Sequence, residues 1–307
     1  MSVAANSTTA AIHGQRLALA ALIAGGIVIG FSPIMARLGD VGPIAMAFLR
    51  VFLAGITLAP LLLLLAPAAS AAPTQQSRWP TSLREASALL LPGLLFAGDL
   101  ATWHWALEYT TVGNSTLIAN QAAPLVALTS WLILGRRFGP MFWLGLVLCS
   151  VGAMILLGSS VKLGGDRWFG DLLAFGTAIC YAGYFLLIER LRRRYDAMVV
   201  VSWSSLSAAL WLLPVFWLAS EPALFPATLA GWGAALGLAW LCHLGGQGLI
   251  AYGLAALPAA FAALAVLLQP ITALLLAWWL FGEALGPVQA LGSLTILTGL
   301  VLARRGV

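Results

Sequence analysis

Long apolar runs dominate the chain, and short polar segments separate them. Runs such as residues 58–65 and 264–268 contain no alternating polar positions, so they do not fit the strands of a membrane β-barrel. Backbone groups in lipid need hydrogen-bond partners within their own segment, which leaves helices of about 20 residues each as the spanning form. The pattern predicts ten helices, at residues 17–37, 43–66, 86–107, 111–134, 140–158, 168–190, 197–219, 230–252, 256–281 and 286–303.

The composition strengthens this interpretation. Only 8% of the 307 residues are charged, and 62% are hydrophobic. A soluble domain carries about 25% charged residues, so this chain has too few charges to cover a water-exposed surface. An ordinary soluble enzyme, a disordered protein and a nucleic-acid binder are therefore excluded. The three cysteines lie in apolar runs without CxxC spacing, so we expect inert thiols, no metal site and no cofactor.

The placement of basic residues predicts the orientation of the helices. With the N-terminus in the cytoplasm, the inner segments hold eleven arginines and the outer loops hold three basic residues. The inner set is Arg16, Arg78, Arg84, Arg136, Arg137, Arg190, Arg192, Arg193, Arg194, Arg304 and Arg305, and the outer set is Arg37, Lys162 and Arg167. This asymmetry predicts an inner-membrane protein with both termini in the cytoplasm, and it explains the net charge of +5. Residues 1–16 are small and polar, and we expect a flexible cytoplasmic N-terminus.

Several pairs of identical residues lie 147 positions apart along the chain. The pairs are Leu107 and Leu254, Gly135 and Gly282, Pro140 and Pro287, Gly145 and Gly292, and Gly152 and Gly299, while Pro124 and Pro270 are 146 apart. The spacing predicts two five-helix halves, residues 17–158 and 168–303.

Because five is an odd number, the two halves must lie upside down relative to each other in the membrane. The charges agree: Arg136 and Arg137 follow Gly135 on the predicted inner side, whereas Glu283 follows Gly282 on the outer side. The predicted fold is an all-α integral membrane protein with two inverted repeats around a central cavity. Inverted repeats are a feature of many secondary transporters, which bind substrate between the repeats. A duplicated channel or membrane enzyme is the alternative.

The chain resembles the drug/metabolite transporter superfamily, and specifically its ten-helix EamA-type exporters. The resemblance covers residues 17–303 and is carried by Pro124 to Gly135, Pro270 to Glu283, the run 106–111, Gly253-Leu254 and Arg50. It implies export of small organic metabolites, commonly amino acids, through a central cavity, with the aromatic amino-acid exporters as the first branch to compare. Arg136 departs from the Glu that often follows this glycine. Its predicted cytoplasmic position leads us to expect no effect on transport.

Ionisable residues within spans are costly and usually functional. Arg50 and Asp99 lie at similar predicted depths, roughly 10–12 Å below the outer surface at ~1.5 Å per residue. We predict an ion pair between them, either direct or bridged by water. Two roles stay open, a structural pair or a gating and coupling pair in which Asp99 takes up a proton.

Two histidines and a glutamine occupy equivalent faces of the third and eighth predicted helices. The 147 spacing relates Phe96, Leu100 and His104 to His243, Gln247 and Ala251, each triplet at i, i+4, i+8. We expect His104, His243 and Gln247 to face the cavity. Trp103, Tyr181 and Tyr184 are candidates for stacking on an aromatic or cationic substrate.

Side-chain amides flank the two repeated prolines. Asn120 and Gln121 precede Pro124, and Gln269 precedes Pro270. Proline leaves a backbone carbonyl free, and a carbonyl beside an amide suits an ammonium group or an amino acid. Hydrogen bonding between helices is the alternative role for these residues.

The function predicted from these features is a secondary transporter that exports small metabolites, most of all aromatic or other neutral amino acids, by alternating access. Its expected partners are a small-molecule substrate and the lipid bilayer, with no nucleic acid, and a monomer is compatible with the sequence. An integral-membrane enzyme and a channel for small solutes are the alternative functions. Clustered nucleophiles or metal ligands would favour the enzyme, and rings of charge would favour the channel.

Overall fold

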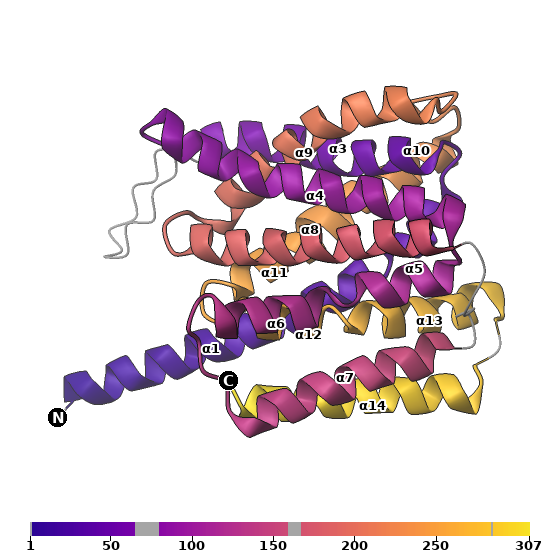
Figure 1. Cartoon of the computed structure of the whole chain (residues 1–307). Helices are drawn as coiled ribbons and strands as arrows, with labels where there is room; N and C mark the ends of the chain where they lie inside the picture. The colour runs from indigo at the N-terminus through magenta and orange to yellow at the C-terminus, as the bar shows by residue number, and fades with distance from the viewer. Residues whose placement is uncertain (1, 65–79, 159–166, 284) are drawn as a thin grey trace.

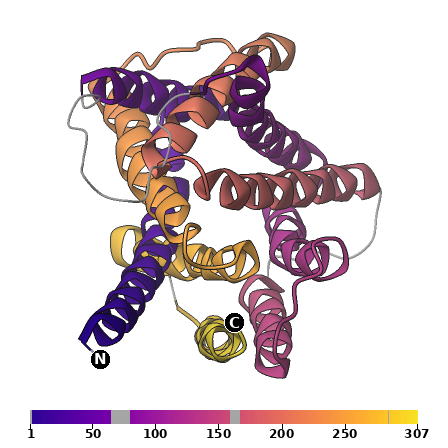
Figure 2. The ribbon, with the colours of Figure 1, turned by 90° about the vertical axis from the view of Figure 1, so that its left-hand side faces the viewer.

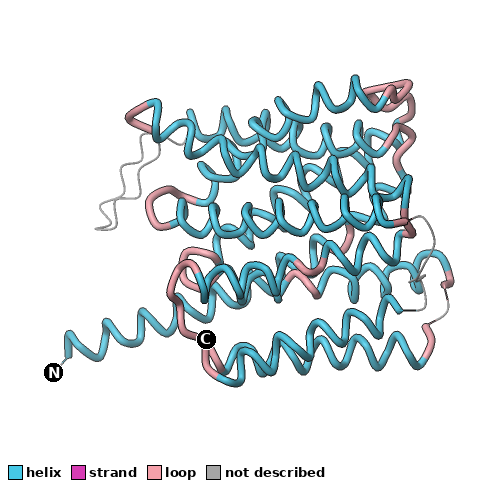
Figure 3. The backbone as a smooth tube through the Cα atoms, in the orientation of Figure 1, coloured by secondary structure: helices cyan, strands magenta, loops and turns pink. Residues whose placement is uncertain are grey.

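A computed structural model describes residues 2–64, 80–158, 167–283 and 285–307, and in these ranges every element is a helix. Figure 3 shows the tube of the backbone as helices joined by short loops. Arg78 and Lys162, two of the basic residues counted above, lie outside the described residues. The helices are α1 (Ser2–Ile29), α2 (Ser32–Leu38), α3 (Pro43–Leu64), α4 (Leu83–Tyr109), α5 (Val112–Ala119), α6 (Ala122–Leu132), α7 (Pro140–Leu157), α8 (Trp168–Arg192), α9 (Ala197–Ala219), α10 (Leu229–Leu236), η2 (Gly237–Gln247), α11 (Gly248–Gly253), α12 (Ala259–Ala265), α13 (Leu268–Phe281) and α14 (Pro287–Arg305).

The helices confirm an all-helical membrane protein. Nine helical segments within the described residues are long and apolar enough to cross a membrane. The remaining predicted span, residues 111–134, is present as two shorter helices, α5 and α6. α1 begins at Ser2, well before the predicted start at residue 17, and its first turns project beyond the rest of the bundle (Figure 1).

Two of the predicted helices are broken at matching places. The break between α5 and α6 falls at Asn120 and Gln121, and the break between α12 and α13 falls at Val266 and Leu267. Each break precedes a proline, Pro124 or Pro270, that has no N–H for the carbonyl four residues earlier. At both places one tighter turn replaces the α-helical pattern, with Gln121 N donating to Ile118 O and Leu267 N donating to Leu264 O, each at 3.0 Å.

The eighth predicted span contains a π-helix. Residues Gly237–Gln247 form η2, which continues α10 and leads into α11. π-helical turns are rare and occur mostly at functional sites. This one carries His243 and Gln247, two of the predicted site residues.

Helices α7 and α14 pack side by side in opposite directions (Figures 1 and 2). Glycines bring their backbones together: a Cβ at Gly145 would lie 2.8 Å from Cα of Ala303, and a Cβ at Gly292 would lie 2.9 Å from Cα of Leu156. Gly145 also faces Gly299, and Gly152 faces Gly292. Small residues permit such close approach of membrane helices, where dispersion forces rather than the hydrophobic effect drive packing.

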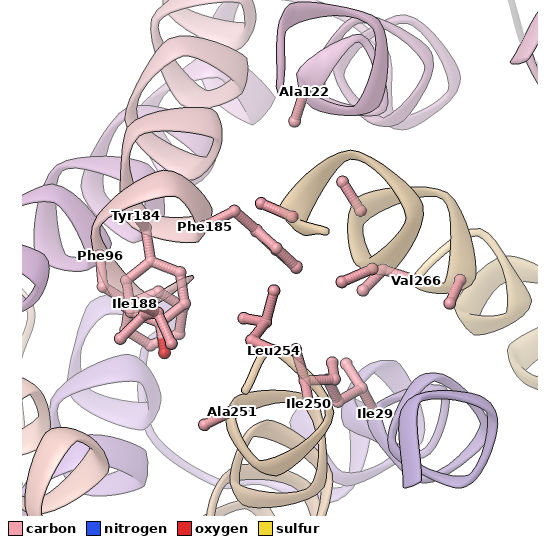
Figure 4. Packing of buried hydrophobic residues seen from close by; sticks show 14 of the residues in the cluster. Ile29, Phe96, Ala122, Tyr184, Phe185, Ile188, Ile250, Ala251, Leu254 and Val266 are labelled. Atoms are coloured by element: carbon pink, nitrogen blue, oxygen red, sulfur yellow. The ribbon is translucent and has the colours of Figure 1, made fainter. Parts of the chain in front are cut away.

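The other large contacts also join the N-terminal helices to the C-terminal ones. α4 packs on α8 and α9, and α1 packs on α11 and η2, while α3 contacts both α9 and η2. Buried apolar side chains pack between them. Figure 4 shows Phe96 of α4 beside Tyr184 of α8, while Phe185 of α8 points toward Leu254. The polar residues described next lie against this aromatic part of the core.

Candidate functional site

Arg50, on α3, is the cation of the candidate site. Its side chain is half-buried, and the guanidinium carbon lies 5.5 Å from the ring centroid of Phe96 on α4. Its Nε is fully buried and has no hydrogen-bond partner among the described residues. A cation over a ring face is stabilised by the ring quadrupole, but the N–H groups of that cation still need acceptors.

Aromatic rings form one wall beside Arg50. Phe96 lies 5.0 Å from the ring of Tyr184 and 5.4 Å from the ring of His243. Tyr181 and Tyr184, one turn apart on α8, are parallel within 4° at 6.0 Å. Three helices, α4, α8 and η2, thus contribute flat rings to one place, an arrangement suited to an aromatic or apolar group.

Two polar side chains of η2 complete this cluster. His243 is buried, and its Nε2 lies 2.9 Å from the hydroxyl of Ser205 on α9, while its Nδ1 has no partner among the described residues. Gln247 is also buried, and its Nε2 donates to the Tyr181 hydroxyl at 3.4 Å, while its Oε1 is left without a described partner. The π-helix therefore presents one free imidazole nitrogen and one free amide oxygen to the interior.

The charge of Arg50 reaches most of the predicted site residues. It interacts electrostatically with Asp99, His104, Tyr181, Tyr184 and His243. We name Arg50, Phe96, Tyr181, Tyr184, His243 and Gln247 the Arg50 cluster.

Asp99 is half-buried and makes no direct ion pair with Arg50 within the described structure. The direct form of the predicted pair is thus not what the structure has. One reason is geometric: Arg50 points its guanidinium at Phe96, nearly one turn from Asp99 along α4. A pair bridged by water stays a prediction.

His104 and Trp103 lie further along α4 and are both half-buried. His104 Nδ1 lies 2.6 Å from the Leu100 carbonyl oxygen, and the two rings meet edge to face at 5.0 Å. His104 shares a helix face with Phe96 and Leu100, as the spacing predicts. It is linked to the Arg50 cluster by charge and helix face, not by a described hydrogen bond.

The proline-flanking amides lie at the helix breaks and make no described contact with the Arg50 cluster. Asn120 is half-buried, and its Nδ2 has no described partner. Gln121 Nε2 donates to the Leu117 carbonyl at 3.2 Å within its own helix segment. Gln269 is half-buried at the other break. Broken helices at corresponding positions of two halves are a frequent place for transporter sites.

Sequence reasoning missed two members of this environment. Phe96 entered only as the repeat partner of His243, although the two rings prove to be in contact. Ser205 carried no signal, because serines on an apolar helix are common. The spacing of 147 between Phe96 and His243 could have identified the contact, since residues related by a two-fold axis meet where they lie near that axis.

Comparison with known proteins decides the family. The EamA-like transporter family model matches residues 16–158 and 168–305, which together make up most of the chain. The chain belongs to the EamA-like transporter family. Family membership and the apolar helices make it a multi-pass membrane protein, and the family and transporter-named relatives point to a transporter rather than an enzyme.

Relatives found by sequence comparison are named as transporters. The chain is 30% identical over 204 residues to an uncharacterized transporter, YwfM, of Bacillus subtilis, a match that covers 64% of this chain and 66% of the relative. An uncharacterized transporter of Archaeoglobus fulgidus is 26% identical over 64% of this chain and 68% of its own length. The chain thus spans about two thirds of these relatives. A solved chain titled "Crystal structure of protein" has the same fold, with a TM-score of 0.73, 19% identity and coverage of 95% and 98%.

Proposed function

We propose that this protein is a secondary transporter that exports small organic metabolites by alternating access. We propose aromatic or other neutral amino acids as its main substrates. The observation that carries the proposal is the set of unpartnered polar atoms beside aromatic rings: Nε of Arg50, Nδ1 of His243 and Oε1 of Gln247. A buried polar atom without a partner costs about 1–3 kcal/mol. Three of them at one place inside a membrane protein are best explained by a ligand or water that completes their hydrogen bonds.

The chemistry of these groups suits an amino acid. The guanidinium of Arg50 can bind a carboxylate, because its N–H donors form a fork that matches two oxygens. The rings of Phe96, Tyr181 and Tyr184 can contact an aromatic or apolar side chain. Asp99, His104 and the amides Asn120, Gln121, Gln269 and Gln247 supply hydrogen-bond acceptors for an ammonium group within the proposed transport path. The Trp103 ring can stack on an aromatic or cationic group.

We propose that the two matched segments are inverted repeats around this path. Antiparallel packing of α7 on α14 supports inversion, because halves with the same orientation would place these two helices parallel. Two contacts join residues separated by the repeat spacing itself. The Cys149 thiol donates to the Ile296 carbonyl at 3.5 Å, and Phe96 contacts His243. Both pairs fit positions next to a two-fold axis in the membrane plane.

The orientation that we propose has both termini in the cytoplasm and the protein in the inner membrane. The arginines of the described inner segments support it, and four of them, Arg136, Arg137, Arg193 and Arg194, gather at one end of the molecule around residues 136–139 and 189–195. The end that bears Arg136 is called the inner end below, and the opposite end, which bears Arg37, is called the outer end.

Reconstituted vesicles test the function. We expect saturable counterflow of a labelled aromatic amino acid when the vesicles are preloaded with unlabelled solute, and no counterflow in protein-free vesicles. Flux that rises without saturation would favour the channel, and chemical conversion of the solute would favour the membrane enzyme. Failure of every tested amino acid, with counterflow of another metabolite, would remove the amino-acid assignment and keep the transporter.

A further inference from the structure

Two of the three ion pairs formed among the described residues lie at opposite ends of the molecule, outside the Arg50 cluster. At the inner end Arg136 Nη1 lies 2.5 Å from Glu189 Oε1, which we call the inner pair. At the outer end Arg37 Nη1 lies 2.9 Å from Glu283 Oε1, which we call the outer pair. Each pair joins the end of a broken helix, α6 or α13, to the end of a helix from the other half, α8 or α2.

Arg136 and Glu283 occupy equivalent backbone positions. Each follows a glycine in the left-handed region, Gly135 at φ +65° and Gly282 at φ +68°. Each donates its backbone N–H to the carbonyl six residues earlier, Arg136 to Ser130 at 2.9 Å and Glu283 to Ala277 at 3.4 Å. In both places a left-handed glycine ends the helix, turns the chain sharply and fixes the residue after the glycine. The two residues are 147 apart, the spacing of the repeat.

Their partners are equivalent as well. Arg37 lies in the last turn of α2, which ends the first predicted span, and Glu189 lies in the last turn of α8, which forms the sixth, so each partner ends the first helix of its matched segment. The repeat has therefore conserved the contact between these two places and exchanged the charges: arginine on the broken helix at the inner end, glutamate on the broken helix at the outer end. Placement by the positive-inside rule accounts for Arg136 but not for a matched partner at each end.

The two pairs differ in burial. The side chains of Arg136 and Glu189 are 23% and 8% exposed, whereas those of Arg37 and Glu283 are 60% and 52% exposed. Removing one member of a buried pair leaves a desolvated charge, while an exposed pair is held only weakly. The inner pair is thus held more firmly in this conformation than the outer pair.

We propose that the inner and outer pairs are the two gates of the transport cycle: both are formed in this structure, and the cycle opens one of them while the other stays closed. This rests on the proposed alternating access. A cavity of about 410 Å³ lies against the inner pair and is lined by Arg136, Arg137, Glu189, Leu257 and Val307, among others. Opening of the inner pair would extend this cavity toward the broken helix α5–α6. Arg136 then acts in transport, contrary to the expectation from its position in the sequence.

Hydrogen exchange on the full chain in lipid nanodiscs tests the gates without knowledge of the substrate. The variant Arg136→Gln leaves Glu189 buried without its partner, so we expect amide exchange at residues 186–195 and 254–258 to rise by more than about fivefold, the upper end of the range for an exposed ion pair. Because the gates alternate, exchange at the outer end, residues 36–42 and 278–283, should fall in the same sample. Glu283→Gln should produce the reverse pattern.

Matched variants separate gating from damage to the fold. Arg305→Gln removes an exposed charge at the same end of the molecule, outside the lining of the cavity beside the inner pair, and we expect exchange at both ends to stay unchanged. The double variant Arg136→Glu with Glu189→Arg gives the inner pair the charge order of the outer pair, and it should restore the wild-type pattern. If amide exchange in Arg136→Gln rises at both ends, or does not change at the outer end, the two pairs are not alternating gates.

The gates and the transport function fail in different ways. Absence of counterflow with a reciprocal exchange response would leave the conformational coupling in place and reject the assigned substrate. Counterflow without reciprocity would keep the transporter and reject these ion pairs as its gates.

Discussion

At the scale of single residues, ionisable groups within apolar runs were the most informative signal. Arg50 and Asp99 stood out because a charge in lipid is costly and needs a reason. The partner of Arg50 was not predictable, because a phenylalanine is unremarkable in a membrane helix and Phe96 meets Arg50 only when α3 packs on α4. The histidine and glutamine of η2 were predictable as one face, but the atom that each leaves free was not.

Arg50→Lys is a sharp test of the site. Lysine keeps the charge and loses the fork of N–H donors that matches a carboxylate. We expect initial counterflow of a labelled amino acid to fall about tenfold, which corresponds to about 1.4 kcal/mol. Arg193→Lys, an exposed arginine at the inner end, is the matched control and should leave counterflow unchanged. Equal rates for Arg50→Lys and wild type would separate Arg50 from carboxylate binding.

At the scale of helices, prolines and glycines determined where helices break and how closely they pack. Pro124 and Pro270 each predicted a free backbone carbonyl within a continuous helix, but the structure breaks both helices three to four residues earlier, where the missing N–H leaves that carbonyl without its partner. The π-helix had no such signal in the sequence, and the structure shows η2 packed against α1 and α3. The glycines of α7 and α14 entered the sequence analysis only as markers of the repeat, and the structure shows that Gly145 and Gly152 let the two helices approach closely.

Two glycine variants separate packing from helix propensity. A Cβ at Gly152 would lie 2.8 Å from the backbone N of Ile296, whereas a Cβ at Gly233 of α10 meets nothing within 4 Å. We expect Gly152→Ala to lower the free energy of unfolding by about 1–3 kcal/mol through overpacking. Gly233→Ala should be neutral or raise it by up to about 1 kcal/mol. Denaturant titration in a defined detergent measures both, and equal effects would contradict the α7–α14 contact.

At the scale of the whole molecule, polar ties join segments far apart in the chain at the outer end. Glu221, after α9, accepts hydrogen bonds from the backbone N–H groups of Ile44 and Ala45, both at 2.8 Å, at the start of α3. Asp40, between α2 and α3, accepts hydrogen bonds from the Thr228 hydroxyl at 2.7 Å and from its backbone N–H at 2.9 Å. The Thr228 hydroxyl is the main cause that lowers the pKa of Asp40 below its ordinary value of 3.8.

The Asp40 tie predicts a pH dependence at the outer end. Because the folded pKa is lowered, the tie is complete above pH 3.8 and weakens as the pH falls through the folded pKa. We expect the start of α10, residues 228–232, to lose hydrogen-exchange protection below that pH, after correction for the intrinsic rate. Asp40→Asn should show the lower protection at neutral pH and no further loss on acidification. An identical pH profile in wild type and Asp40→Asn would contradict the tie.

The sequence by itself determined the membrane, the helices and the spacing of 147, because apolar run length and the cost of charge in lipid act locally along the chain. Only the tertiary structure decided which side chains meet: Arg50 with Phe96, His243 with Ser205, and the two charge-exchanged pairs at opposite ends. These contacts join residues far apart in the chain. Their formation depends on how helices rotate and approach one another, and that is set by packing across the whole bundle rather than by any single segment.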